Sequence, residues 1–287
     1  STQRQTALQQ LGRVDWLGQN WQVRVDVEQF QSLADDIRND YKKLPQITTR
    51  WRGTQDWNGV EPVLMTQLSH FDSDSRHVTG ERMYVEAGLT MPNRWAFGFL
   101  TPTVKYRSVS YELDDHTLIE DDSPEAGSLM ASLDGGLIFE RQTKLGGVSM
   151  TQTLEPRAYY LYSDFEEQTD HPDFDSAELT FSYEQLYRDT RFSGHDRIDD
   201  SNQLAVGVTS RFINNATGNE TLRASIGQIF YFRDREVRLN RIDPDLTEAT
   251  SAIAAEMAWS PSRAWRVRSS LLFDPNDNNF DAAYAQA

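Results

Sequence analysis

The stretch Trp21-Gln-Val-Arg-Val-Asp-Val-Glu28 decides the fold of this chain. A bulky apolar residue alternates with a polar or charged residue at every step. Because successive side chains of a β-strand point to opposite faces, the stretch predicts a strand with one apolar and one polar face. The apolar face carries Trp21, Val23, Val25 and Val27, and the polar face carries Gln22, Arg24, Asp26 and Glu28. A soluble sandwich can show the same alternation, so its recurrence along the chain is informative.

The alternating pattern recurs along the whole chain and predicts about fourteen strands, within a range of roughly 12 to 16. Ala177–Tyr183 is one of these predicted strands. Short turns alternate with long polar loops, as in outer-membrane barrels with short periplasmic turns and long extracellular loops. The turns are centred near Gly18, Asn58, Pro92, Gly146, Asn214 and Pro261, and the loops span Ser32–Leu44, Ser73–Glu81, Asp114–Ser128, Asp164–Ser176 and Glu236–Thr250.

Composition narrows the class of protein. The 287 residues are 38% hydrophobic and 25% charged, with a mean hydropathy of -0.64. The sequence contains no run of about 18 apolar residues, which excludes a helical membrane protein. A transmembrane barrel remains possible because half of each strand faces a polar lumen. The net charge of -16 argues against nucleic acid as a partner.

A set of motifs that follow one another in a fixed order gives information beyond the fold class. It comprises Lys43–Ile47, Leu154–Tyr162, Phe174-Asp175-Ser176, Arg191–Ile198, Asn202-Gln203-Leu204 and Thr209–Phe212. This set resembles the LptD family, outer-membrane proteins of Gram-negative bacteria that assemble lipopolysaccharide. The match is strongest over residues 150–235, and the strand rhythm is compatible with the family elsewhere.

The resemblance implies an all-β fold, a fragment of an antiparallel transmembrane β-barrel in the bacterial outer membrane. Residues 1–287 would form part of a single barrel domain, with the N-terminal periplasmic jellyroll and the terminal barrel strands outside the chain. The implied function is membrane biogenesis: a translocon whose lumen guides the saccharide of lipopolysaccharide and whose lateral opening releases the lipid. The cysteines that join the jellyroll to the barrel in the family are absent here, because the chain has no cysteine.

The resemblance also implies partners. They are an LptE-like lipoprotein plug, lipopolysaccharide, an LptA-like periplasmic bridge acting through the N-terminal domain, and outer-membrane lipids; no cofactor is expected. A porin-like passive channel is the alternative function, and a soluble β-rich carbohydrate-active enzyme is a weaker third. We expect no enzyme and no catalytic or metal site, because nucleophile motifs, phosphate-binding loops and zinc-ligand spacings are missing.

The strand predicted over Leu154–Tyr162 places Glu155 and Arg157 on one face. These side chains either face a lumen and contact a plug or saccharide, or form a cross-strand ion pair inside a polar barrel. Pro156 has no backbone N–H to donate, which predicts a weak point in strand pairing.

The charged loop Arg191–Arg197 supplies the remaining candidates. It either folds into the lumen or binds a partner, or it is an ordered loop held by its own Arg–Asp contacts. For His195 we expect a structural role, because no second histidine or cysteine lies nearby in sequence. The candidates for lumen-facing or partner-contacting residues are Arg24, Asp26, Glu28, Glu155, Arg157, Arg191, His195, Asp196 and Arg197.

Overall fold

The computed structural model describes residues 7–32, 41–54, 58–74, 78–116, 119, 121–240, 246–262, 264–276 and 279–286. These residues form one antiparallel sheet and a single short 3₁₀ helix, η1. The elements are β1 (Ala7–Leu17), β2 (Trp21–Ser32), β3 (Lys42–Arg52), β4 (Glu61–Asp72), β5 (Val78–Thr90), β6 (Asn93–Trp95), β7 (Gly98–His116), β8 (Glu125–Leu137), β9 (Phe139–Leu145), β10 (Val148–Ser163), η1 (Tyr183–Tyr187), β11 (Ser201–Asn214), β12 (Glu220–Tyr231), β13 (Ile253–Trp259), β14 (Val267–Asp274) and β15 (Asn279–Gln286).

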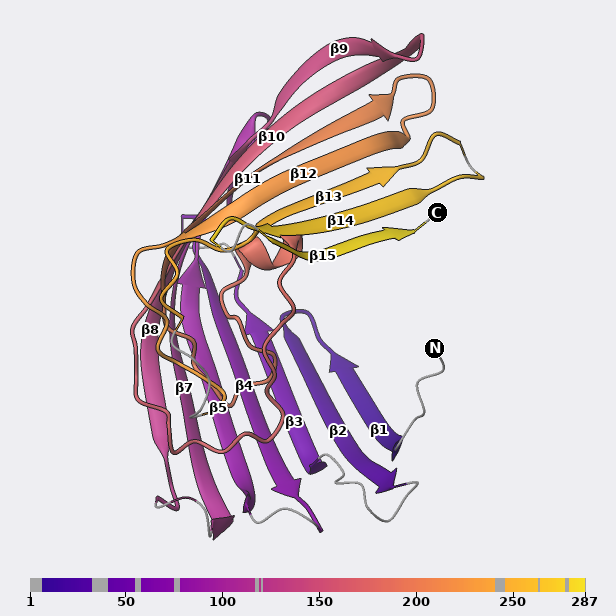
Figure 1. The fold of residues 1–287 in the computed structure, drawn as a ribbon. Helices are drawn as coiled ribbons and strands as arrows, with labels where there is room; N and C mark the ends of the chain where they lie inside the picture. The colour runs from indigo at the N-terminus through magenta and orange to yellow at the C-terminus, as the bar shows by residue number, and fades with distance from the viewer. Residues whose placement is uncertain are drawn as a thin grey trace.

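Strands that follow one another in sequence are neighbours in the sheet, as expected for successive hairpins. The order runs from β1 to β15, with β6 paired only to β7 and β9 only to β10. Figure 1 shows the sheet curving around a concave inner side, with β1 and β15 at its two ends. The described residues contain no pairing that joins β1 to β15. The predicted strand number is confirmed by the fifteen strands of this sheet.

No helix in the described part of the chain is long and apolar enough to cross a membrane. The sheet has instead an inverted distribution of polarity. On β2, Asp26 is only 5% exposed while its neighbour Val27 is 46% exposed, and the outward Val104 of β7 is 49% exposed. Polar side chains on the inner face, including Thr48, Gln67, Ser69 and Arg82, are buried. Exposing so much apolar area to water is unfavourable, so this outer face is suited to lipid.

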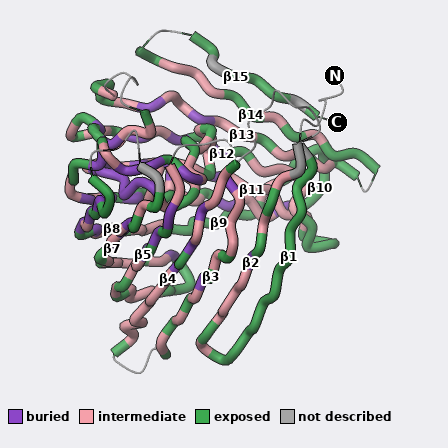
Figure 2. The backbone as a smooth tube through the Cα atoms, turned by 90° about the horizontal axis from the view of Figure 1, so that it is seen from below, coloured by how far each residue is buried: buried purple, intermediate pink, exposed green. Residues whose placement is uncertain are grey.

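The connection from β10 to β11 covers the inner face of the sheet. We call residues 164–200 the inner segment. Its Phe174 and Ile198 pack with Phe71 and Tyr111 of the sheet, and its Leu186 packs with residues of β8, β10, β11 and β12. Figure 1 shows the segment inside the curve of the sheet, and Figure 2 shows buried residues gathered around β5, β7 and β8.

Two predictions are therefore wrong. Asp164–Ser176 is not an external loop, because burial of Phe174 and ion pairing of Asp175 hold it against the inner face. Ala177–Tyr183 is not a strand of the sheet, since its pairing in the described structure is one isolated bridge between Glu178 and Phe192 within the inner segment. Most of the predicted loop Ser32–Leu44 lies outside the described residues.

Candidate functional site: the inner segment and its polar cluster

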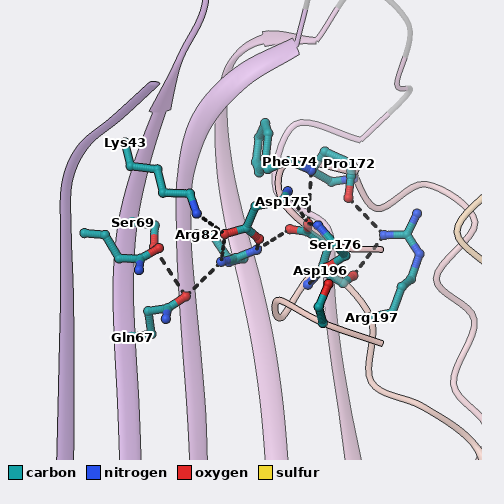
Figure 3. Close-up of polar contacts among 12 residues, drawn as sticks. Lys43, Gln67, Ser69, Arg82, Pro172, Phe174, Asp175, Ser176, Asp196 and Arg197 are labelled. Atoms are coloured by element: carbon teal, nitrogen blue, oxygen red, sulfur yellow. Dashed lines mark hydrogen bonds and ion pairs between the residues drawn. The ribbon is translucent and has the colours of Figure 1, made fainter. Parts of the chain in front are cut away.

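Arg82 of β5 anchors the inner segment to the sheet. Its side chain is buried, and its guanidinium donates to Asp175 Oδ1 at 2.7 Å, to Gln67 Oε1 at 2.8 Å and to Asp196 Oδ1. The guanidinium also lies 4.9 Å from the centroid of the Phe71 ring. Figure 3 shows these groups converging from β4, β5 and the inner segment. One buried cation thus connects two strands to two separate parts of the inner segment.

The carboxylate of Asp196 organises the backbone of the inner segment. Its Oδ2 accepts hydrogen bonds from the backbone N–H groups of Phe174, Asp175 and Ser176 at 3.0, 2.9 and 3.1 Å. Its Oδ1 accepts from Arg82. Such complete pairing is what allows a carboxylate to be fully buried.

Lys43 of β3 balances the remaining charge. Its ammonium lies 2.8 Å from Asp175 Oδ2, so two cations face the two carboxylates of Asp175 and Asp196. Burial acts to raise the pKa of Asp175, but Arg82 and Lys43 together lower it well below its usual range. We call Lys43, Gln67, Arg82, Asp175, Asp196 and Arg197 the polar cluster.

Arg197 extends the cluster to a second loop. Its guanidinium donates to the carbonyls of His171, Pro172, Arg238 and Leu239, all within 3.2 Å. The loop after β12 is therefore held against the inner segment.

Asp199 and Asp200 reinforce the same connection. Arg191 pairs with Asp199 at 2.6 Å, and Asp200 accepts from the backbone N–H groups of Glu236 and Val237, both at 3.1 Å. The loop Arg191–Arg197 lies on the concave side of the sheet, and ion pairs to Asp199 and Arg82 hold its two ends. Whether it contacts a partner stays a prediction.

Two histidines of the inner segment pack against tyrosine rings of the sheet. His195 stacks on Tyr84, with centroids 4.0 Å apart, and His171 makes an edge contact with Tyr111 at 5.2 Å. Burial, reinforced by Arg82, lowers the pKa of His195 to about 4. Burial, reinforced by Arg197, lowers the pKa of His171 to about 4. The structural role expected for His195 stays a prediction, which its stacking on Tyr84 supports.

Glu155 and Arg157 make cross-strand ion pairs with different neighbours. Arg157 forms a two-pronged contact with Asp134 of β8 at 2.8 and 2.7 Å and lies 3.9 Å from the centroid of the Tyr187 ring. Glu155 lies 3.1 Å from Arg211 of β11. These pairs match the second of the two interpretations given to these residues, and whether they also contact a partner stays a prediction.

Pro156 lies where strand pairing is interrupted. On one side it stands opposite Val208 of β11 without a register shift. On the other side, β10 pairs with β9 up to Leu154 and with β8 from Arg157 onward, so Pro156 falls between the two ladders. The proposed weakness at this position remains a prediction, and its location at this interruption supports it.

The polar residues of the opening stretch lie on the inner face, beside strand β1. Arg24 pairs with Asp15 at 2.7 Å and Asp26 with Arg13 at 2.6 Å, while Glu28 lies 3.7 Å from Lys43. Glu28 is thereby adjacent to the polar cluster. Arg24 and Asp26 are not part of it.

A cavity of about 940 Å³, lined by both polar and apolar side chains, lies on the same inner side, and we call it the inner chamber. Tyr187, Arg188 and Asp189 of the inner segment form part of its lining. The sheet contributes side chains that include Arg50, Glu86, Thr90, Thr101, Thr103, Lys105, Ser132 and Asp134. No group of three or more His, Asp or Glu side chains within the described ranges is placed to hold a metal ion.

Sequence reasoning missed Arg82, Lys43 and Gln67 as site residues. Arg82 is 93 residues from Asp175 and 114 from Asp196, so no local motif joins them. One signal was present: Arg82 occupies an inward position of a strand, where an arginine requires buried carboxylates.

An apolar outer face, a polar inner face and an internal loop segment define the wall of an outer-membrane β-barrel. Comparison with known proteins gives the family. The model of "LPS transport system D", LptD, matches residues 1–287. The chain belongs to the LptD family, and it is accordingly an outer-membrane protein of a transport and assembly family rather than an enzyme.

Individual relatives agree. The chain is 37% identical to an LPS-assembly protein LptD of Alcanivorax borkumensis, with 98% of the chain and 38% of the relative covered. It is 36% identical to one of Hahella chejuensis, over 95% of the chain and 35% of the relative. It is 33% identical to an LPS-assembly protein LptD of Pseudomonas aeruginosa, over 98% of the chain and 36% of the relative. The chain spans somewhat more than a third of the length of these relatives.

Proposed function

We propose that this chain is part of the wall of an outer-membrane translocon that assembles lipopolysaccharide into the outer leaflet. The observation that carries the proposal is the pairing of a lipid-facing apolar exterior with a polar interior in a member of the LptD family. In this role the inner face guides the saccharide, and lateral opening of the complete barrel releases the lipid.

The inner segment supports a translocon rather than a passive porin-like channel. It packs on the inner face through two apolar clusters and the buried polar cluster, so part of the interior is occupied by ordered chain. We further propose that residues 1–287 form part of one barrel domain, completed by terminal strands and a periplasmic jellyroll outside this chain. An LptE-like lipoprotein plug and an LptA-like bridge are the proposed partners.

A photo-crosslinking amino acid at two adjacent positions of β2 tests the proposed function. Glu28 lies on the inner face and Val27 on the outer face. In growing cells, we expect position 28 to form a lipopolysaccharide adduct that disappears when the supply of new lipopolysaccharide is stopped. Adducts at position 27 should persist, because that side chain contacts resident membrane lipid. Absence of a supply-dependent adduct at position 28, together with free passage of small solutes, would instead indicate a porin.

A further inference from the structure

The acidic groups of the inner chamber are already neutralised by neighbouring cations. Glu86 lies 2.9 Å from both Lys105 and Arg107, and Asp189 lies 3.2 Å from Lys105 and 2.5 Å from Arg107. Asp134 is held by Arg157 at 2.7 Å. Three carboxylates are therefore matched by three cations around the chamber.

Two further cations of the chamber lining have no carboxylate partner in the part of the chain that the structure describes. Arg50 of β3 and Arg188 of the inner segment line the cavity, and the guanidinium of neither makes a hydrogen bond or ion pair with another described residue. The lining thus carries an excess of positive charge in a chain whose net charge is -16. Positive charge retained in this way favours an anionic ligand, since unpaired guanidinium groups offer several oriented donors.

The lining contains apolar side chains such as Met65 and Met130, but it also carries hydroxyl groups that are suited to a sugar. Thr90 and Thr103 present hydroxyl groups 2.9 Å apart, and the hydroxyls of Thr101 and Ser132 also belong to the lining. Hydroxyl groups both donate and accept hydrogen bonds, as sugar hydroxyls do. The volume of about 940 Å³ lies at the upper end of the range for small-molecule sites.

We propose that the inner chamber is a binding site for a saccharide bearing phosphate or carboxylate groups. Arg50 and Arg188 contact the anionic group, and the threonine and serine hydroxyls contact the sugar. Because Arg50 belongs to the sheet and Arg188 to the inner segment, a bound anion connects the two. This inference rests on the proposed function, in that it assigns a place on the inner face where a charged part of the cargo pauses.

Calorimetric titration of the purified protein in detergent tests this site. The probe is the phosphorylated oligosaccharide released from lipopolysaccharide by removal of its acyl chains. We expect Arg50→Ala and Arg188→Ala each to weaken binding about fivefold and the double variant about twentyfold, as for exposed charge-assisted contacts. Enzymatic dephosphorylation of the probe should weaken binding to wild type, and added salt should do the same.

Arg94→Ala is the matched control, because Arg94 of β6 is exposed and does not line the chamber. It should bind the probe as wild type does. Equal affinity of wild type and the double variant would overturn the site. Competition by inorganic phosphate at the same concentration as the oligosaccharide would show a free-phosphate site and overturn the role given to the sugar. If the titration fails while the position-28 adduct forms, only the chamber is disproved; loss of that adduct would disprove the proposed function.

Discussion

Arg82→Met is expected to lower the free energy of unfolding by about 3–5 kcal/mol, the largest single-residue effect that we predict. The substitution leaves the buried carboxylates of Asp175 and Asp196 without their central cation. Lys43 is still within 2.8 Å of Asp175, but Asp196 keeps only hydrogen bonds within the inner segment and from Tyr111. Urea unfolding in detergent measures the loss, and limited proteolysis should show earlier cleavage within residues 164–200.

Two further variants make this expectation specific. Arg24→Ala removes a partly exposed ion pair with Asp15 and should cost about 1 kcal/mol or less. Combining Arg82→Met with Asp175→Asn and Asp196→Asn removes the unpaired charges and should restore part of the stability. If Arg82→Met were no more harmful than Arg24→Ala, the polar cluster would not be what holds the inner segment.

Lowering the pH is expected to have the second largest effect on the stability of the folded protein. The folded protein keeps His195 and His171 neutral, with a pKa of about 4 in place of the ordinary 6.5. Between these values the unfolded chain binds protons that the folded chain does not, so stability falls as the pH falls through this window. Each histidine contributes up to about 3 kcal/mol. The depressed pKa of Asp175 acts only at lower pH, because its stabilisation is lost below the ordinary carboxyl range.

Hydrogen exchange of the inner segment between pH 7 and pH 4 measures this effect directly. The groups facing His195 are Arg82, Glu86, Asp175 and Asp196, and Arg197 and Asp196 face His171. We expect the inner segment to lose protection before the strands do. A double variant, His171→Gln with His195→Gln, should be much less sensitive to pH, whereas His70→Gln, on β4 beside Glu81, should behave as wild type. Equal pH sensitivity in the double variant and wild type would refute the role of the two histidines.

The strands and their faces could be predicted from the sequence because their signal is local. The alternation at Trp21–Glu28 places Asp26 inside and Val27 outside, and the structure has both in those positions. The same signal failed at Ala177–Tyr183. Its Phe181 packs against an apolar cluster of the inner face, so it has a buried and an open side without belonging to the sheet. Alternation of apolar and polar residues indicates that one side of a segment is buried. It does not indicate whether the segment pairs with a neighbouring strand.

Only part of the candidate site could be predicted from the sequence. Arg191 and Asp199 are only eight residues apart, and their contact joins the charged motif Arg191–Ile198 to the residue that directly follows it. Arg82 meets Asp175 and Asp196 only because the curved sheet brings β5 against the inner segment. That the guanidinium groups of Arg50 and Arg188 have no ion-pair partner among the described residues is likewise a property of the folded lining. Which charges remain without partners depends on every neighbour in three dimensions.

We propose that the sheet presents one face to lipid and the other to a polar interior. Because the chain has no cysteine, a single introduced cysteine can carry a fluorescent label without competition. Thr103 and Val104 are adjacent on β7, the first lining the inner chamber and the second exposed on the outer face. In lipid vesicles, we predict that a lipid-borne quencher quenches the label at Val104 and a water-soluble quencher the label at Thr103. Quenching of both labels by the same reagent, or the reverse assignment, would contradict the account.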